Sequence, residues 1–206
     1  ATENYLYSST GWEIQQEYIA SSLIETINNK CFDQIVACVP SIKESIIENT
    51  NFDPDKIIIA PNGCDYKAIK SYISNLNHSK ELNKKYEKIV CFQGTINTRL
   101  DYQLLYEIIS GLPTFRFNFF GKLAETEENI DHWNKIVSLP NVSFFGDLNQ
   151  RLLFKEISKA DVAIIPYISD EWIKASLPLK SFEYLAVGIP VVTVPINYLE
   201  SYSECF

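Results

Sequence analysis

The stretch LPLKSFEYLAVGIPVV, residues 177–192, carries the clearest structural signal in the chain. Pro178 stands at the start of a helical pattern, Gly188 at its end, and Pro190 leads into the β-branched run VVTV at 191–194. Proline in the first turn and glycine just past the last turn are the usual boundary residues of a helix. The stretch therefore predicts a helix that runs between a loop and a strand.

One face of this predicted helix is apolar. Leu179, Phe182 and Ala186 recur at three- and four-residue spacing, which predicts that they face the core. Glu183 lies four residues after Leu179, at the edge of that stripe. A carboxylate at this position is either a solvated charge at the rim or a ligand for a molecule that docks at the helix.

The same alternation of strands and helices runs back through most of the chain. Strands are expected at Ile35–Val39, Ile57–Ile59, Ile89–Phe92, Phe115–Phe120, Val142–Phe145, Val162–Ile165 and Val191–Val194. Helices are expected at Trp12–Asn29, Ile42–Glu48 with Ser41 as its cap, Tyr102–Ser110, Asn129–Ser138 and Gln150–Ala160. This order predicts an α/β fold with a doubly wound, Rossmann-like parallel sheet. Right-handed crossovers then place the carboxyl ends of the strands at one edge, where such folds bind ligands.

Composition sets limits on the function. The 206 residues are 46% hydrophobic and 21% charged, as in a globular protein with a sizeable core. The formal net charge of −8 argues against a nucleic-acid partner, because phosphate neutralisation requires a basic face. The best apolar runs, Val162–Ile165 and Val191–Val194, are too short to span a bilayer.

The cysteines and the first residue add two further expectations. The five cysteines are scattered and never spaced as CxxC, so the sequence indicates neither a zinc site nor a disulfide framework. Reduced thiols in an intracellular protein are the simple interpretation. The chain starts with alanine and contains no methionine, which favours a fragment or a processed chain.

Small or turn-forming residues follow several predicted strands. These pairs are Gly94-Thr95, Gly121-Lys122, Gly146-Asp147 and Pro166-Tyr167. Tight turns in any α/β protein explain each pair on its own. The motifs GxGxxG, GxxxxGK[ST], HExxH and GxSxG are absent, which disfavours dehydrogenase, P-loop, zincin and nucleophile-elbow enzymes.

Taken in order, six short segments resemble a known family. They are PNGCD (61–65), QGTINTRLD (93–101), FNFFGK (117–122), NVSFFGDL (141–148), ADVAIIPY (160–167) and PLKSFEYLAVGIPVV (178–192). The series resembles the C-terminal half of GT-B glycosyltransferases of family 4 (glycosyl transferases group 1), and within them it is similar to teichuronic-acid and capsule-type transferases. The resemblance covers residues 33–195. It implies that residues 1–64 are the end of an N-terminal acceptor domain with the hinge, and that 65–206 are a nucleotide-sugar-binding domain truncated at its C-terminus.

The resemblance also implies where a diphosphate would bind. In the family, the donor is a nucleotide diphosphate sugar whose diphosphate lies at a helix N-terminus. The helix that opens at Pro178 offers free amides and the positive end of its dipole. Lys180 and Arg99 are the implied catalytic cations, and Gly94 with Thr95 would let the backbone approach the phosphates. The alternatives are a solvated lysine, and an Arg99 that pairs with Asp101 or lies at the surface.

Glu183 matches the glutamate that accepts hydrogen bonds from the ribose hydroxyls of the donor. A carboxylate suits a vicinal diol because it presents two charged acceptor oxygens. The base would lie near Phe145 and Gly146, and Tyr167 would border the sugar and the diphosphate, although core packing also explains these aromatic residues. The rest of the predicted donor-binding set precedes or begins the helix: Ser176, Leu177, Pro178 and Leu179.

The sequence departs from the family at one position. Many members carry another glutamate eight residues before the one that Glu183 matches, and that position here is Ala175. Asp170 and Glu171 lie nearby but out of register, which leaves their contact with the sugar undecided. His78 and His132 lie away from the predicted strand ends and are assigned no role. No metal or other cofactor is expected.

The resulting hypothesis is a glycosyltransferase that transfers a sugar, with retention, from a nucleotide diphosphate sugar to a glycan or lipid-linked acceptor. It would be cytoplasmic, with room for peripheral attachment to the inner membrane face through the first domain. One alternative is a catalytically inactive GT-B module that binds a nucleotide sugar or a partner. Another is a nucleotide-sugar 2-epimerase, which would require catalytic acids and a histidine at the cleft.

Overall fold

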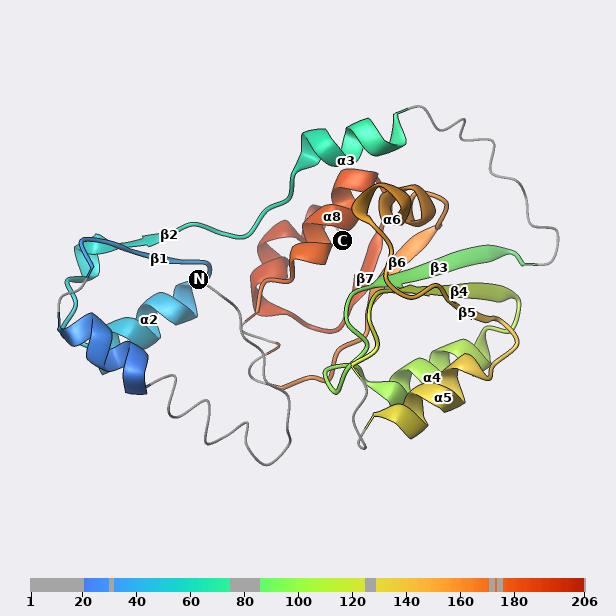
Figure 1. Ribbon diagram of the computed structural model, residues 1–206, viewed down its shortest axis with the longest axis horizontal. Coiled ribbons are helices and arrows are strands. Elements are labelled where there is room, and N and C mark those ends of the chain that lie inside the picture. Colours follow the sequence, from blue (N-terminus) through green and yellow to red (C-terminus); the bar gives the residue numbers. More distant parts are fainter. Residues whose placement is uncertain are drawn as a thin grey trace. The chain divides into compact units, whose positions relative to one another are not determined.

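The computed structural model describes residues 21–29, 32–74, 86–124, 129–170, 173 and 176–205 (Figure 1). The chain divides into two compact units, Ala1–Pro61 and Asn62–Phe206. This division falls close to the predicted boundary between residues 64 and 65, while the assignment of the first unit to an acceptor domain stays a prediction.

The first unit is a small parallel βαβ arrangement. Residues 21–28 are helical, and they are followed by β1 (Ile35–Ala37), α2 (Pro40–Asn49), a 3₁₀ turn (Pro54–Lys56) and β2 (Ile57–Ile59). Strands β1 and β2 pair in parallel, with Ile35 opposite Ile57. The core of this unit is made of buried apolar side chains: Ile27, Ala37, Phe52 and Ile57.

The prediction that Ser41 caps α2 is wrong. The helix begins at Pro40, two residues before the predicted start at Ile42, and its N-cap residue is Val39. Proline fits the first helical position because its fixed φ suits the helix and its missing N–H would have had no partner there. Ser41 therefore lies inside the first turn of α2.

The second unit is built on a five-stranded parallel sheet. The strands are β3 (Lys88–Gln93), β4 (Phe115–Phe120), β5 (Val142–Phe144), β6 (Val162–Ile165) and β7 (Val191–Thr193), and they lie in the order β5-β4-β3-β6-β7. The chain builds outward from β3 to β5 and then returns to the other side of β3. This reversal between β3 and β6 is a topological switch point, where open α/β sheets bind ligands beyond the carboxyl ends of the strands.

Helices cover both faces of this sheet. They are α3 (Tyr66–Ile73), α4 (Tyr102–Gly111), α5 (Ile130–Val137), α6 (Gln150–Ile157) and α8 (Leu179–Val187), followed by a 3₁₀ segment (Asn197–Cys205). Figure 1 shows α4 and α5 on one face of the sheet and α3, α6 and α8 on the other. The predicted doubly wound α/β fold is therefore confirmed.

Aromatic side chains fill the layer between the sheet and α5. Phe92 on β3 and Phe117 and Phe119 on β4 are buried. The ring of Trp133 from α5 packs edge-on against Phe119, with 5.2 Å between ring centroids, and against Phe144 at 5.1 Å. This packing fixes the strands whose carboxyl ends form the edge described below.

Helix α3 was missing from the sequence prediction. Its N-cap residue Asp65 accepts a hydrogen bond from the amide of Ala68 at 3.0 Å, and Ile69 and Ile73 are its buried residues. An aspartate followed by apolar residues four apart is a usual sign of a helix start and could have revealed this helix. Of the predicted helix Trp12–Asn29, residues 12–20 lie outside the described residues.

No helix among the described residues is long and apolar enough to cross a membrane.

Candidate functional site

Two glycines bring the turns after β3 and β4 into close contact. Gly94 and Gly121 have φ of +137° and +130°, a region that side chains rarely allow. The Gly94 amide donates to the carbonyl of Phe120 at 2.9 Å, and the Gly121 amide donates to that of Gly146 at 2.7 Å. A Cβ on Gly121 would collide with the Gly94 carbonyl. The turns after three neighbouring strands are thus packed into one continuous edge.

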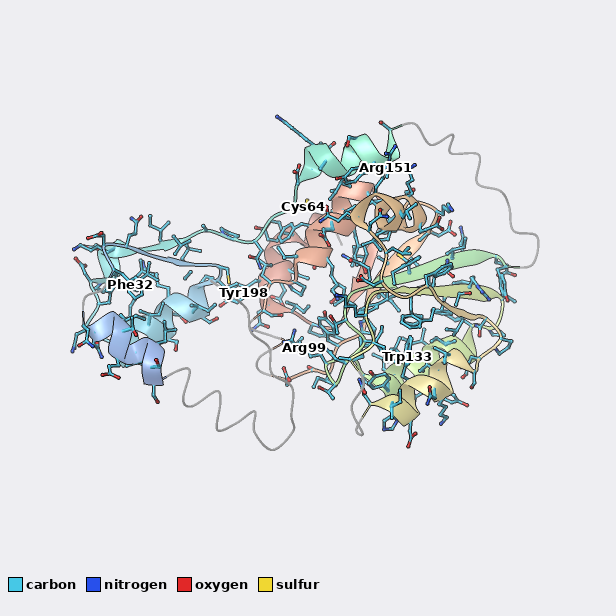
Figure 2. The ribbon with its side chains drawn as sticks, in the orientation of Figure 1. Phe32, Cys64, Arg99, Trp133, Arg151 and Tyr198 are labelled. Carbon is cyan, nitrogen blue, oxygen red and sulfur yellow. The ribbon has the colours of Figure 1, made fainter. Side chains whose placement is uncertain are left out.

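The loop after Gly94 is held to the loop after β6. The buried side chain of Asn97 accepts a hydrogen bond from the Arg99 amide at 3.1 Å. The Ile168 amide donates to the Arg99 carbonyl at 2.8 Å, and Leu100 forms a bridge with Tyr167. These contacts fix the backbone of Arg99 at the switch point, where Figure 2 labels it on the loop that follows β3.

Lys180, in the first turn of α8, directs its ammonium group into this edge. Its Nζ lies 4.3 Å from the ring centroid of Phe92 and 4.8 Å from that of Tyr167. It also lies so close to Gly94 that a Cβ there would strike it. The missing side chain at residue 94 therefore makes room for the lysine as well as for the turn.

The surroundings of Lys180 lower its pKa to about 7, mainly through burial. The negative charge of Glu183 acts in the opposite direction, and the positive charge of Arg99 lowers the pKa of Lys180 further. The faces of the two aromatic rings favour the charged ammonium and so oppose the effect of burial. Of the two neighbouring charges, the attraction of Glu183 has the larger effect on the pKa of Lys180.

Helix α8 begins without a side-chain cap. Pro178 is its N-cap residue, and the first turn contains Lys180 but no acidic residue. The first amides of any helix lack partners within the helix. A positive side chain beside them is unfavourable for the helix alone, because both carry positive charge. An anion at this turn would satisfy the amides and the lysine together.

The segment before α8 is tied down by polar contacts. The side-chain amide of Asn62 donates to the Leu177 carbonyl at 2.8 Å. The Ser176 hydroxyl donates to the Ile173 carbonyl at 2.8 Å, and the Asp170 carboxylate accepts from the Ile173 amide at 2.6 Å. Asp170 thus stabilises the turn that leads to α8, whereas Glu171 and Ala175 lie outside the described residues.

Glu183 is half-buried and contacts the last residue of β3. The side-chain amide of Gln93 donates a hydrogen bond to its Oε2. The next helix residue, Tyr184, is fully buried, and its hydroxyl accepts from the backbone amide of Gln93 at 2.7 Å. Burial raises the pKa of Tyr184 well above its ordinary value, so the phenol stays neutral. Glu183 is therefore placed at the same edge as Lys180 and Gly94.

The predicted apolar stripe of α8 is wrong in part. Leu179 is 53% exposed and Phe182 is only partly buried, with its ring edge-on to Tyr202 at 5.6 Å. The helix instead buries Ser181, Tyr184, Ala186 and Val187. Both sets have helical spacing, and the large Tyr184, whose hydroxyl reaches β3, selects the face that turns inward.

The remaining predicted residues lie along the same edge. Phe145 is 44% exposed and stacks on Phe120 at 4.9 Å, beside Gly146. Thr95 is exposed, while Tyr167 is buried. Burial raises the pKa of Tyr167 to about 12, although the positive charge of Arg99 acts to lower it. The exposed ring of Phe145 and the two cations are thus separated along the edge by the packed glycine turns.

The sequence of this domain matches a known protein family. The model of the family described as glycosyl transferases group 1 matches residues 87–203, which is more than half of the chain. The chain belongs to this family.

Relatives of this glycosyl transferases group 1 chain include TuaH of Bacillus subtilis (strain 168), which is named as a teichuronic acid biosynthesis glycosyltransferase. TuaH is 25% identical over 181 residues, covering 87% of this chain and 44% of TuaH. Among solved structures, WaaG, a glycosyltransferase involved in lipopolysaccharide biosynthesis, matches with TM-score 0.62 and 18% identity over 83% of this chain and 47% of WaaG. Anabaena HepE, solved with UDP and glucose, matches with TM-score 0.59 and 15% identity over 87% of this chain and 49% of HepE. These neighbours support the GT-B-type fold, and the chain spans about half the length of the proteins it matches.

Within this glycosyl transferases group 1 domain, sequence reasoning missed Phe92, Gln93 and Asn62. Phe92 ended a predicted strand and Gln93 began the segment QGTINTRLD, and only the fold shows that they meet Lys180 and Glu183. His132, which was assigned no role, stacks on Tyr102 with 5.8 Å between ring centroids, and His78 lies outside the described residues. No group of three or more His, Cys, Asp or Glu suited to a metal occurs in the described part of the chain. The expectation of metal-independent chemistry stays a prediction.

Proposed function

We propose that this chain binds the donor of a glycosyltransferase, a nucleotide diphosphate sugar, at the carboxyl edge between β3 and β6. The observation that carries the proposal is the first turn of α8, which combines uncapped amides with the Lys180 ammonium group beside Arg99. A diphosphate has the charge and the acceptor oxygens that this turn lacks.

The same groups would assist the reaction. When the bond between the sugar and the diphosphate breaks, negative charge grows on the diphosphate leaving group. Cations and amides already held in place stabilise that charge without reorganisation, and so lower the barrier rather than merely tighten binding. Lys180 is held by the rings of Phe92 and Tyr167, and Arg99 by the backbone contacts of its loop.

Glu183 would bind the ribose of the nucleotide. Its carboxylate stands one helical turn from Lys180, which suits a ligand whose ribose and diphosphate are directly joined. Phe145 offers an exposed aromatic face farther along the edge, where a base can stack.

The relatives support the broader reaction. TuaH is named for a glycosyl transfer in teichuronic acid biosynthesis, and HepE was solved with UDP and glucose. We propose a glycan or lipid-linked acceptor, transfer with retention and no metal requirement. We also propose a cytoplasmic location, with peripheral attachment to the inner membrane face through a first domain.

The test is a titration of UDP-, GDP- and ADP-sugars into the protein at its natural full length, with Lys180→Met and Glu183→Gln variants. We expect sugars of one base to bind. Lys180→Met should weaken binding by about 10- to 100-fold, because charge-assisted hydrogen bonds contribute about 1.5–3 kcal/mol. Glu183→Gln should weaken it by about tenfold.

A matched control is Lys67→Met, which removes an exposed lysine of α3. It should leave binding unchanged. If no nucleotide sugar binds, or if Lys180→Met binds as well as the wild type, the proposed site is wrong. Binding without transfer to any acceptor would indicate the inactive-module alternative.

A further inference from the structure

The last residue of β3 is held by two consecutive residues of α8. The backbone amide of Gln93 donates to the Tyr184 hydroxyl at 2.7 Å, and its side-chain amide donates to Oε2 of Glu183. Strand and helix are therefore joined at one residue by a backbone contact and a side-chain contact. The backbone contact fixes the main chain of Gln93, so its side chain reaches Glu183 from a defined position.

This contact matters because Glu183 has a competing partner. Lys180 lies three residues earlier on the same helix, and the two charges attract each other, since Glu183 raises the pKa of Lys180. Residues three apart on a helix are close enough to form an ion pair. Among the ion pairs of the described residues, none joins Lys180 to Glu183.

A closed pair between Lys180 and Glu183 would occupy the groups that the proposed donor needs. The side-chain amide of Gln93 is a partner of a different kind for this carboxylate. This amide is neutral, so it binds the carboxylate without cancelling its charge. A lysine or arginine in its place would cancel that charge. The Gln93 amide also engages only one of the two carboxylate oxygens, which leaves the other with its acceptor capacity.

We propose that Gln93 is a positioning residue for Glu183, holding its carboxylate toward the ribose hydroxyls of a nucleoside diphosphate and away from Lys180. This inference rests on the proposed function. Gln93 acts through Glu183, so its effect depends on whether the ligand carries ribose hydroxyls.

The test compares Gln93→Met with the wild-type protein at full length. Methionine keeps the length of the side chain and removes its hydrogen bonds, while the backbone contact to Tyr184 stays. The probes are the nucleoside diphosphate of the base that binds (UDP, GDP or ADP) and its 2′,3′-dideoxy analogue. We expect Gln93→Met to weaken binding of the ribose form by about 3- to 10-fold and to leave binding of the dideoxy form unchanged.

Two further variants separate positioning from folding. In a Glu183→Gln background, Gln93→Met should have no additional effect on the ribose form, because coupled residues are not additive. Tyr184→Phe removes the backbone contact instead. It should lower the unfolding temperature while the preference for the ribose form over the dideoxy form is retained. If Gln93→Met does not fold, Gln93→Leu removes the same hydrogen bonds.

The outcomes distinguish the two proposals. If Glu183→Gln reduces the preference for the ribose form and Gln93→Met does not, the role of Gln93 is wrong while the donor site stands. An equal loss for the ribose and dideoxy forms in Gln93→Met would also overturn it, because that pattern indicates a general structural role. If no nucleoside diphosphate binds the wild type, both proposals fail.

Discussion

Helices α4 and α8 both begin at the carboxyl edge of the sheet, but their first turns are completed in different ways. Asp101 caps α4 by accepting a hydrogen bond from the Leu104 amide at 2.8 Å. The first turn of α8 has Pro178 at the same position, no side-chain cap and a lysine. Helix α4 supplies its own negative group, whereas α8 lacks one and adds a positive charge.

The difference is the feature on which the proposed donor site depends. Helices α3 and α6 resemble α4, since Asp65 and Asn149 cap them. Helix α5 has no side-chain cap but carries Asp131 in its first turn. Helix α8 alone among these five combines no cap with a basic first turn, and it stands at the switch point.

The largest expected effect comes from filling the space that Lys180 uses. Gly94→Ala places a Cβ against the Lys180 ammonium group and requires a φ of +137°. We expect the free energy of unfolding to fall by about 2–3 kcal/mol, and donor binding to be lost because Lys180 must move. Chemical denaturation and calorimetric titration measure the two effects.

Gly63→Ala is the matched control for that substitution. A Cβ on Gly63 has no neighbour within 4 Å, and its backbone is not left-handed. Stability and donor affinity should both stay within error of the wild type. A Gly94→Ala variant that binds donor normally would show that α8 does not depend on this contact.

A smaller effect is expected from pH. The pKa of Lys180 is lowered to about 7 in the free protein, and a bound diphosphate favours the charged form and raises that pKa again. Donor binding above pH 7 therefore takes up a proton. Affinity should be constant below about pH 7 and fall above it by up to about tenfold per pH unit, until the pKa of the bound form is reached.

The stability of the free protein should change with pH in the opposite direction. The unfolded state, with an ordinary lysine pKa of 10.5, binds more protons than the folded state between pH 7 and 10.5. This group therefore makes stability rise with pH in that window.

Titrations of a nucleotide sugar from pH 6 to 9 check the pH dependence of binding. Lys180→Arg, which stays charged, should flatten the profile of affinity against pH. An equally steep profile in Lys180→Arg would assign the proton to another group.

The smallest effect is expected at α4. Asp101→Ala removes the cap and should lower the free energy of unfolding by about 1 kcal/mol, which corresponds to about 2–4 °C in the unfolding temperature. Donor affinity should not change, and Asp101→Asn should restore stability because asparagine also caps helices. If Asp101→Ala weakened donor binding as much as Lys180→Met, the proposed distinction between α4 and α8 would not hold.

Much of the fold was predictable from local signals. Strands β4 and β6 match their predicted limits, because Gly121 and Pro166 end them abruptly. The order of strands and helices was enough to predict the parallel sheet. Helix α3 was not predicted, although Asp65 followed by Ile69 and Ile73 carries the local signal of a helix start.

The site was predictable only in outline. Gly94, Lys180 and Glu183 were expected at the strand ends and do lie together there, although their roles stay predictions. The inward face of α8 was not predictable, because two sets of residues have helical spacing and contacts with β3 select one of them. Gln93 carries no local signal of its contact with Glu183, since that contact joins residues far apart in the sequence.

The packing of Gly121 on the Gly94 carbonyl limits how this protein can diverge. A side chain on Gly121 would displace the turn at Gly94, and a side chain on Gly94 would meet Lys180. If the edge binds the proposed donor, changes in preference are easier at exposed positions such as Thr95 and Phe145. A lineage that adapts to different sugars would keep the glycine framework fixed and vary the residues around it.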